Sequence, residues 1–482
     1  MDRQSTISKV VNGFAWEGST KLLVQIITWV STILVARILS PEDYGIVAIS
    51  GIFVGVLAII TDLGFMSALI NQKDITDEEM DSSFWFSILI SALLFMLLYY
   101  IAPFIAAAYG SEILSDIIRV SAVILPLTSL KIVPTAIAMR ELNYKYRAIT
   151  EMGGQFVTAA ASILMAYNGF GVWTLVYSVI IGQTIVVLAY LPLLKHIPAF
   201  GIKFRKIRGI INYGMHLMFS QILEFFTLRA DVFIISLFMS EKLVGYYSMG
   251  FHLATMPMDK IGSVFNRVGF PAISRIKVDV EESRRLFLYL HKYLVIITYP
   301  VLVGFMLIAE DLVVLFLTDK WLPVVPLIQV LCLLNLLRIS GMIMPYVLAG
   351  LGHSKSVFWF QALSSIAMPV AFLVGAQYGL DGVLAGWFIV YPFLYGVIVR
   401  MLLRHLKFSL REYLLTFRSA VICTVIMFVA VRFMQSQEIF GHDTLALAGD
   451  IMFGAAAYIL SFYLLFKAEF LQVYNKLKGI RS

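Results

Sequence analysis

The sequence is poor in charged residues and has almost no cysteine. Charged side chains make up 14% of the 482 residues and hydrophobic ones 60%, whereas about 25% charged is usual in a soluble domain. Soluble cores stop growing at roughly 250–300 residues, so we expect the lipid bilayer to be the solvent of this chain. Cys332 and Cys423 both lie in apolar runs and provide neither a disulfide framework nor a metal-binding spacing.

The motifs of several enzyme classes are also missing. There is no GxxxxGK[ST] phosphate loop, which excludes ATP hydrolysis by this chain, and no HExxH, CxxC or GxSxG motif. No outward connection is long enough to present a catalytic pair of carboxylates. We therefore expect a protein that is not an enzyme, uses no cofactor or metal, does not bind nucleic acid, and is driven by an ion gradient or by the gradient of its substrate.

Long apolar runs, by contrast, fill the sequence. About 20 mostly apolar residues cross a bilayer core about 30 Å thick. A segment surrounded by lipid must satisfy its own backbone hydrogen bonds, so each run is predicted to be a helix. The fourteen predicted spans are 13–36, 45–70, 83–105, 115–139, 148–167, 171–194, 213–239, 245–266, 287–309, 323–350, 357–377, 381–403, 417–434 and 446–466.

The chain contains an internal repeat. LVARILSPEDYG, from Leu34 to Gly45, is matched in register by IISLFMSEKLVG, from Ile234 to Gly245, and Pro134 is matched by Pro345 at a slightly larger offset. A duplicated apolar unit is typical of transporters built from two lobes. The sequence predicts an N-lobe at 1–194, a linker at 195–212, a C-lobe at 213–404, and a region at 405–482 with two unpaired spans.

The distribution of lysine and arginine predicts the orientation in the membrane. Among cations outside the spans, only Arg37, Lys242 and Lys320 fall on the side opposite the termini, so both termini are expected to be cytoplasmic. Six spans per lobe put both lobes in the membrane the same way up, related by an axis along the membrane normal. The basic linker 195–212 is either an amphipathic element held by anionic lipid or a passive tether.

Two cations lie where a membrane protein rarely places them. An ionisable group near the bilayer centre costs about 2.5–3.5 kcal/mol on insertion scales and is functional by default. Lys131 and Arg338 occupy the interiors of spans 115–139 and 323–350, which are counterparts in the repeat. We expect them to face each other across a central cavity; buried ion pairs that only fix the packing are the alternative.

Spans 1, 7 and 8 carry further ionisable residues. Glu17 and Lys21 share one face of the first span and either line the cavity or neutralise each other. Arg229 and Asp231 lie about 200° apart around their helix, so only one can face a cavity; Arg229 is preferred because a phosphorylated substrate needs cations. The candidates for ion coupling, with helix packing as the alternative role, are Asp231, Asp259, His252 and Glu224.

Several short motifs resemble a known family. ARILSPEDYG at 36–45, DLGF at 62–65, NRVGFPAISRI at 266–276, DKWLP at 319–323 and LLR at 336–338 resemble the polysaccharide transporter branch of the multidrug/oligosaccharidyl-lipid/polysaccharide exporter superfamily, in particular its colanic-acid-type flippases.

This resemblance implies an all-α integral membrane protein with two pseudo-symmetric six-helix lobes in a V and two extra C-terminal helices. It also implies a cationic cavity through which an undecaprenyl-pyrophosphate-linked oligosaccharide is flipped to the periplasmic leaflet of a bacterial inner membrane. Of the site residues, only Arg338 is carried over, because it lies in the LLR motif.

Two other functions are left open. An ion-coupled multidrug or small-molecule exporter of the same superfamily should have acids and few cations in its cavity. A membrane glycan polymerase or acyltransferase should have a large outward loop and no repeat, whereas this chain has the repeat and lacks the loop. We expect a monomeric flippase whose partners are the lipid-linked glycan, membrane lipid and, as a further expectation, the polysaccharide polymerase or export machinery.

Overall fold

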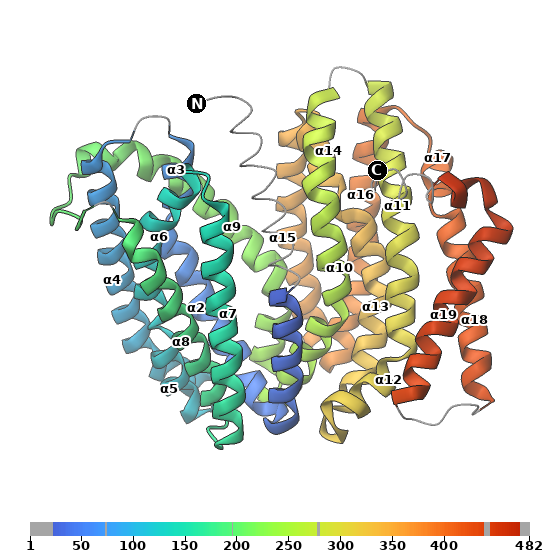
Figure 1. Cartoon of the computed structure of the whole chain (residues 1–482), viewed down its shortest axis with the longest axis horizontal. Coiled ribbons are helices and arrows are strands. Elements are labelled where there is room, and N and C mark those ends of the chain that lie inside the picture. The colour runs from blue at the N-terminus through green and yellow to red at the C-terminus, as the bar shows by residue number, and fades with distance from the viewer. Residues whose placement is uncertain (1–22, 73–74, 195, 277–279, 438–443, 473–482) are drawn as a thin grey trace. The chain divides into compact units, whose positions relative to one another are not determined.

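The computed structural model describes residues 23–72, 75–194, 196–276, 280–437 and 444–472. Almost all of these residues are helical, and they include no β-strand. The chain divides into two compact units, Met1–Gly245 and Tyr246–Ser482, and each is a bundle of long helices (Figure 1). The predicted all-α class is confirmed.

The first unit is built from helices joined by short turns. Its most extensive helix–helix packing is between α7 and α8, and between α4 and α6. Its helices are Leu23–Ile38, α2 Pro41–Asp62, α3 Phe65–Asn71, α4 Asp77–Tyr109, α5 Glu112–Ser121, α6 Ile124–Arg140, α7 Tyr144–Tyr167, α8 Trp173–Tyr190 with a 3-10 turn at Leu191–Leu193, and α9 Phe204–Phe238.

The second unit is also built from long helices joined by short turns. Pairs α15 and α16, α11 and α13, and α18 and α19 pack most extensively. Its elements are α10 Glu241–Ile276, which starts at the unit boundary, α11 Val280–Leu307, α12 Ala309–Leu312, the short turns Val313–Leu317 and Asp319–Trp321, α13 Val324–Met342, α14 Met344–Gly350, α15 Ser354–Ala376, α16 Gly379–Leu406, α17 Leu410–Leu415, α18 Arg418–Ser436 and α19 Thr444–Leu465.

Ten of the described helical segments are long and apolar enough to cross a membrane. Four other predicted spans coincide with Leu23–Ile38, α7, α9 and α10, which are not among the ten. The count of fourteen therefore stays a prediction. Large apolar side chains are exposed on several of these helices, such as Phe104 on α4, Ile389 on α16 and Met452 on α19. Lipid is the solvent in which such surfaces are stable.

The first repeated motif forms the start of α2. The Ser40 hydroxyl accepts a hydrogen bond from the Asp43 backbone N–H at 3.2 Å, and the Asp43 carboxylate accepts one from the Ser40 N–H at 2.8 Å. With Pro41 in the first turn, this is a capping box on a helix start that proline favours. The sequence SPED thus explains locally why the helix begins where it does.

The matched glycines of the repeat lie against each other within the first unit. A side chain on Gly45 would collide with the Glu241 carbonyl oxygen, and one on Gly245 would collide with the Pro41 carbonyl oxygen. The first turns of α2 and α10 are therefore in backbone contact, which only glycine permits.

The matched prolines, in contrast, have different effects. Pro134 lies inside the continuous helix α6, whereas Pro345 stands in the first turn of α14, just after the break that ends α13. The two matched prolines therefore stand in different local settings, one within a helix and one at a helix start.

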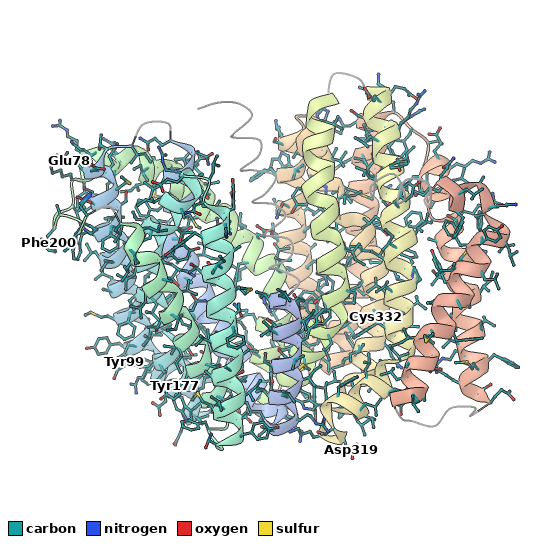
Figure 2. The ribbon with its side chains drawn as sticks, viewed as in Figure 1. Glu78, Tyr99, Tyr177, Phe200, Asp319 and Cys332 are labelled. Atoms are coloured by element: carbon teal, nitrogen blue, oxygen red, sulfur yellow. The ribbon has the colours of Figure 1, made fainter. Side chains whose placement is uncertain are left out.

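The start of the linker is fixed onto α4 in an extended conformation. His196 Nε2 lies 2.9 Å from Asp81 Oδ1, and the Trp85 indole N–H donates to the Pro198 carbonyl at 3.1 Å. Phe200 packs edge-on against the Trp85 ring, and Figure 2 shows it at the same end of the unit as Glu78. From Phe204 the chain continues as α9, across the predicted boundary at 212, so the domain limits stay a prediction.

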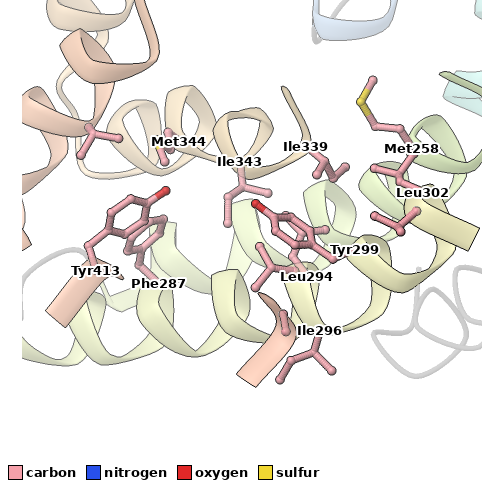
Figure 3. Close-up of a cluster of buried hydrophobic side chains, with 14 of the residues drawn as sticks. Met258, Phe287, Leu294, Ile296, Tyr299, Leu302, Ile339, Ile343, Met344 and Tyr413 are labelled. Carbon is pink, nitrogen blue, oxygen red and sulfur yellow. The ribbon is translucent and has the colours of Figure 1, made fainter. Parts of the chain in front are cut away.

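Each unit has its own apolar core. The core of the first unit gathers Phe65, Leu69, Ile132 and Ile207 from α3, α6 and α9. In the second unit, Leu294 and Tyr299 of α11 pack with Ile339 of α13, next to Phe287 and Tyr413 (Figure 3). These cores hold the helices that position the site residues.

Candidate functional site

Arg338 lies in an aromatic and amide cage inside the second unit. Its guanidinium carbon is 5.1 Å from the ring centre of Phe251 on α10 and 5.1 Å from that of Trp387 on α16. Its Nη1 donates a hydrogen bond to the Asn335 side-chain oxygen at 3.1 Å. Among the described residues, Asn335 is the hydrogen-bond partner given for the guanidinium, and the two cation–π contacts lie on its faces.

Further hydrogen bonds fix the walls of this cage. Asn335 is 1% exposed, and its amide donates to the Ala254 carbonyl at 2.8 Å. The Trp387 indole donates to the Tyr247 hydroxyl at 3.1 Å, and the same ring packs against Phe372. The arginine is thus held in place by neutral groups, and no carboxylate forms an ion pair with it among the described residues.

Lys131 occupies the corresponding helix of the first unit. It is half-buried on α6, and its Nζ donates to the Gln183 side-chain oxygen on α8 at 2.9 Å. As at Arg338, the partner is a neutral amide, so the positive charge is not cancelled within the described part of the chain. Lys131 and Arg338 belong to different units, and their facing one cavity stays a prediction.

The other predicted site residues fall into three groups. On α9, Arg229 and Glu224 are exposed, whereas Asp231 is 1% exposed and its carboxylate accepts from the Val232 backbone N–H at 2.8 Å. His252 on α10 is exposed. Glu17, Lys21 and the side chain of Asp259 lie outside the described residues.

Some residues of the site were missed by sequence reasoning. Gln183 offered a signal, since it is an amide inside an apolar predicted span. Phe251 and Trp387 offered none, because aromatic residues make up 14% of the chain and nothing in the sequence sets these two apart. No group of histidine, cysteine and acidic residues in the described ranges could hold a metal ion.

An apolar groove lies where the two extra C-terminal helices pack on the second unit. It has a volume of about 400 Å³ between α11, α18 and α19. Pro300, Phe305, Met427 and Ile459 are among the residues that line it, and Asp450 is its acidic member. The Asp450 carboxylate accepts a hydrogen bond from Gln435 at 2.8 Å. The groove suits a hydrocarbon chain. Two of its three walls, α18 and α19, correspond to the two predicted spans that have no counterpart in the repeat.

Comparisons with known sequences place the chain in a family. A family model described as "Polysaccharide biosynthesis protein" matches residues 34–326. The teichuronic acid biosynthesis protein TuaB of Bacillus subtilis (strain 168) is 23% identical over 96% of each chain. The succinoglycan biosynthesis transport protein ExoT of Rhizobium meliloti (strain 1021) is 24% identical, over 77% of this chain and 75% of ExoT.

Solved structures share the fold. The lipid II flippase MurJ in an inward closed conformation superposes with a TM-score of 0.78 at 14% identity, over 94% of this chain and 99% of MurJ. An inward-facing multidrug transporter of the MATE family in the MOP superfamily gives 0.60 at 16% identity, over 80% and 96% of the two chains. Together with the family match, these findings confirm the resemblance read from the motifs. The chain belongs to the polysaccharide biosynthesis protein family, in the polysaccharide transporter branch of the multidrug/oligosaccharidyl-lipid/polysaccharide exporter superfamily.

Proposed function

We propose that this protein is a flippase that moves undecaprenyl-pyrophosphate-linked oligosaccharide units from the cytoplasmic to the periplasmic leaflet by alternating access. The cargo is bound and released without being chemically changed. In this proposal both termini are cytoplasmic, the membrane is a bacterial inner membrane, and the protein acts as a monomer that hands its cargo to a polysaccharide polymerase or export machinery.

The observation that carries the proposal is the pairing of half-buried cations with amides. Lys131 is held by Gln183 and Arg338 by Asn335, so each keeps a positive charge that a carboxylate would have cancelled. Such charges inside an apolar bundle are stabilised when an anion enters. An edge of an arginine matches two phosphate oxygens, and pyrophosphate is the anionic part of the proposed cargo.

The groove on the second unit supports a lipid-linked cargo. Its walls are almost wholly apolar, and helices α11, α18 and α19 hold it open at about 400 Å³. A polyprenyl chain that passes from lipid into this groove stays in apolar surroundings, so the tail need not enter water. The names of TuaB and ExoT, with their teichuronic acid and succinoglycan, support a glycan as the polar part.

The test is export of surface glycan by a strain whose only flippase is this protein. Arg338→Ala should reduce export about a hundredfold, because the loss of a charge-assisted contact with phosphate is worth about 1.5–3 kcal/mol and cannot be replaced. Lipid-linked glycan should accumulate on the cytoplasmic leaflet, while the amount of the protein in the membrane stays normal.

Arg119→Ala is the matched control. Arg119 also lies over an aromatic ring, that of Tyr99 at 4.8 Å, but it is paired with the Asp116 carboxylate at 3.6 Å. Its loss should leave export unchanged. Normal export by Arg338→Ala, or an equal loss in both variants, would contradict the proposed role of Arg338.

A further inference from the structure

His291 is buried where α11 meets α17 and α18. The side chain is 0% exposed, and its ring is 4.9 Å from the ring centres of both Tyr413 and Phe417. Nδ1 lies 2.9 Å from the Thr416 hydroxyl, and Nε2 lies 3.1 Å from the Tyr413 hydroxyl. Both ring nitrogens are therefore bonded to the segment that leads from α16 into α18.

The hydrogen-bond pattern determines which nitrogen carries the proton. The Thr416 hydroxyl donates to the Tyr413 carbonyl at 2.6 Å, so it can only accept from His291. Nδ1 is then the protonated nitrogen and Nε2 the acceptor, to which the Tyr413 hydroxyl donates. Every polar atom of the cluster is satisfied when the ring is neutral.

A second proton on the ring would place a positive charge in a fully buried site. The Tyr413 hydroxyl would have to turn its proton toward Tyr395 and accept from Nε2–H, so the hydrogen-bond direction of the whole cluster would reverse. The titratable groups that face the cluster are hydroxyls, those of Tyr413, Tyr395, Tyr299 and Tyr391.

Four charged side chains on the surrounding elements have contacts away from the His291 ring. Lys292 of α11 pairs with Glu469 at 2.9 Å, Glu412 of α17 caps its own helix at Ser409, Arg418 of α18 lies over Phe466, and Arg338 of α13 lies in its aromatic cage. Among the described residues, no carboxylate contacts the His291 ring.

A chain of hydroxyls leads from His291 toward the surface of the unit. The Tyr413 hydroxyl is hydrogen-bonded to that of Tyr395 on α16, and Tyr395 is only half-buried. A proton that arrives at the Tyr395 oxygen can displace the Tyr395 proton to Tyr413 and the Tyr413 proton to Nε2. The net result is one proton gained by His291 and two hydroxyls turned to point outward.

We propose that His291 is a proton-binding site that acts as a latch on α17. Neutral His291 holds α17 and the start of α18 on α11; the protonated ring releases them, because the packed state cannot accommodate the charge. The neutral form is the one that fits the packed state, so the contribution of the latch to stability is present at higher pH and is lost as the pH falls. The inference does not depend on the proposed cargo, since its ligand is the proton alone.

The experiment is hydrogen exchange of the full chain in nanodiscs, followed by mass spectrometry between about pH 5.5 and about pH 8 and corrected for the intrinsic rate. In the wild type, the backbone amides of 410–420 should lose at least about tenfold of their protection at the acid end. In His291→Gln, whose amide can bond both hydroxyls but does not titrate, protection should not change with pH.

Two further variants test whether the pH response comes from His291. His353→Gln removes a histidine at the start of α15, which stacks on His405, and it should respond to pH as the wild type does. Tyr413→Phe removes the hydrogen bond that ties the neutral ring to α17, so the latch is weaker and release should occur at a higher pH. Protection that is independent of pH in the wild type, or an unchanged pH response in His291→Gln, would overturn the latch.

Discussion

The two units hold their half-buried cation in different ways. In the first unit Lys131 makes one hydrogen bond, to Gln183. In the second unit Arg338 makes one to Asn335 and is also stacked between Phe251 and Trp387. The predicted counterpart helices thus share a cation and an amide partner, while among the described residues aromatic walls are found at Arg338 and not at Lys131.

Both sites hold a cation by an amide, whereas the two rings at Arg338 also fix the orientation of the cation. A flexible lysine with one amide can turn toward an anion in several positions, whereas a planar guanidinium between two rings is fixed in one. We infer that the second unit supplies the oriented phosphate contact and the first unit supplies charge. Four sets of variants test this division of roles, and the one with the largest expected effect comes first.

Arg338→Lys should reduce glycan export by about tenfold to a hundredfold. Lysine keeps the charge but cannot stack its plane between two rings or offer two parallel N–H groups. Export per molecule of membrane-inserted protein is the measurement. Export at the wild-type level would show that charge alone is sufficient in the second unit and that the aromatic walls are only structural.

Gly45→Ala should destabilise the protein by about 1–3 kcal/mol, since the new Cβ has no room beside the Glu241 carbonyl. Thermal unfolding in detergent would report the change. Gly51→Ala, on the same helix with nothing within 4 Å of the added carbon, is the control and should be neutral or slightly stabilising. Equal melting temperatures for the two variants would contradict the close contact of the repeated glycines.

Asn335→Ala should cost about 1–2 kcal/mol of stability, because it removes hydrogen bonds to both Arg338 and the Ala254 carbonyl. Gln183→Ala, which removes only the bond to Lys131, should cost less. The same melting assay compares the two, and export should fall more for Asn335→Ala. A larger loss of stability or of export for Gln183→Ala than for Asn335→Ala would contradict this expectation.

Lys131→Arg should have the smallest effect, below about threefold in export, because a lysine site with one amide partner and no stacking demands only charge. The export assay used for Arg338 measures it. A loss as large as that of Arg338→Lys would show that the first unit also orients its cation, and the proposed division of roles would fail.

The sequence predicted the fold class and singled out two cations as candidate site residues, but it indicated only part of their surroundings. Lys131 and Arg338 were visible because a charge in an apolar run is rare. The amide partner of Arg338 could be predicted, because Asn335 is one turn away on the same helix. The partner of Lys131 could not, because Gln183 is brought to it by the packing of α8 on α6. His291 drew no attention because it lies at the end of a predicted span, where a histidine is ordinary.

The sequence by itself determined that the chain is helical and built from a repeat, because apolar runs must close their own hydrogen bonds in lipid and matched motifs are visible without coordinates. Only the tertiary structure decided which charges remain uncancelled. Charge compensation depends on which side chains meet between helices that are far apart in the sequence. Gln183 contacts Lys131, and Trp387 contacts Arg338, only because their helices pack together.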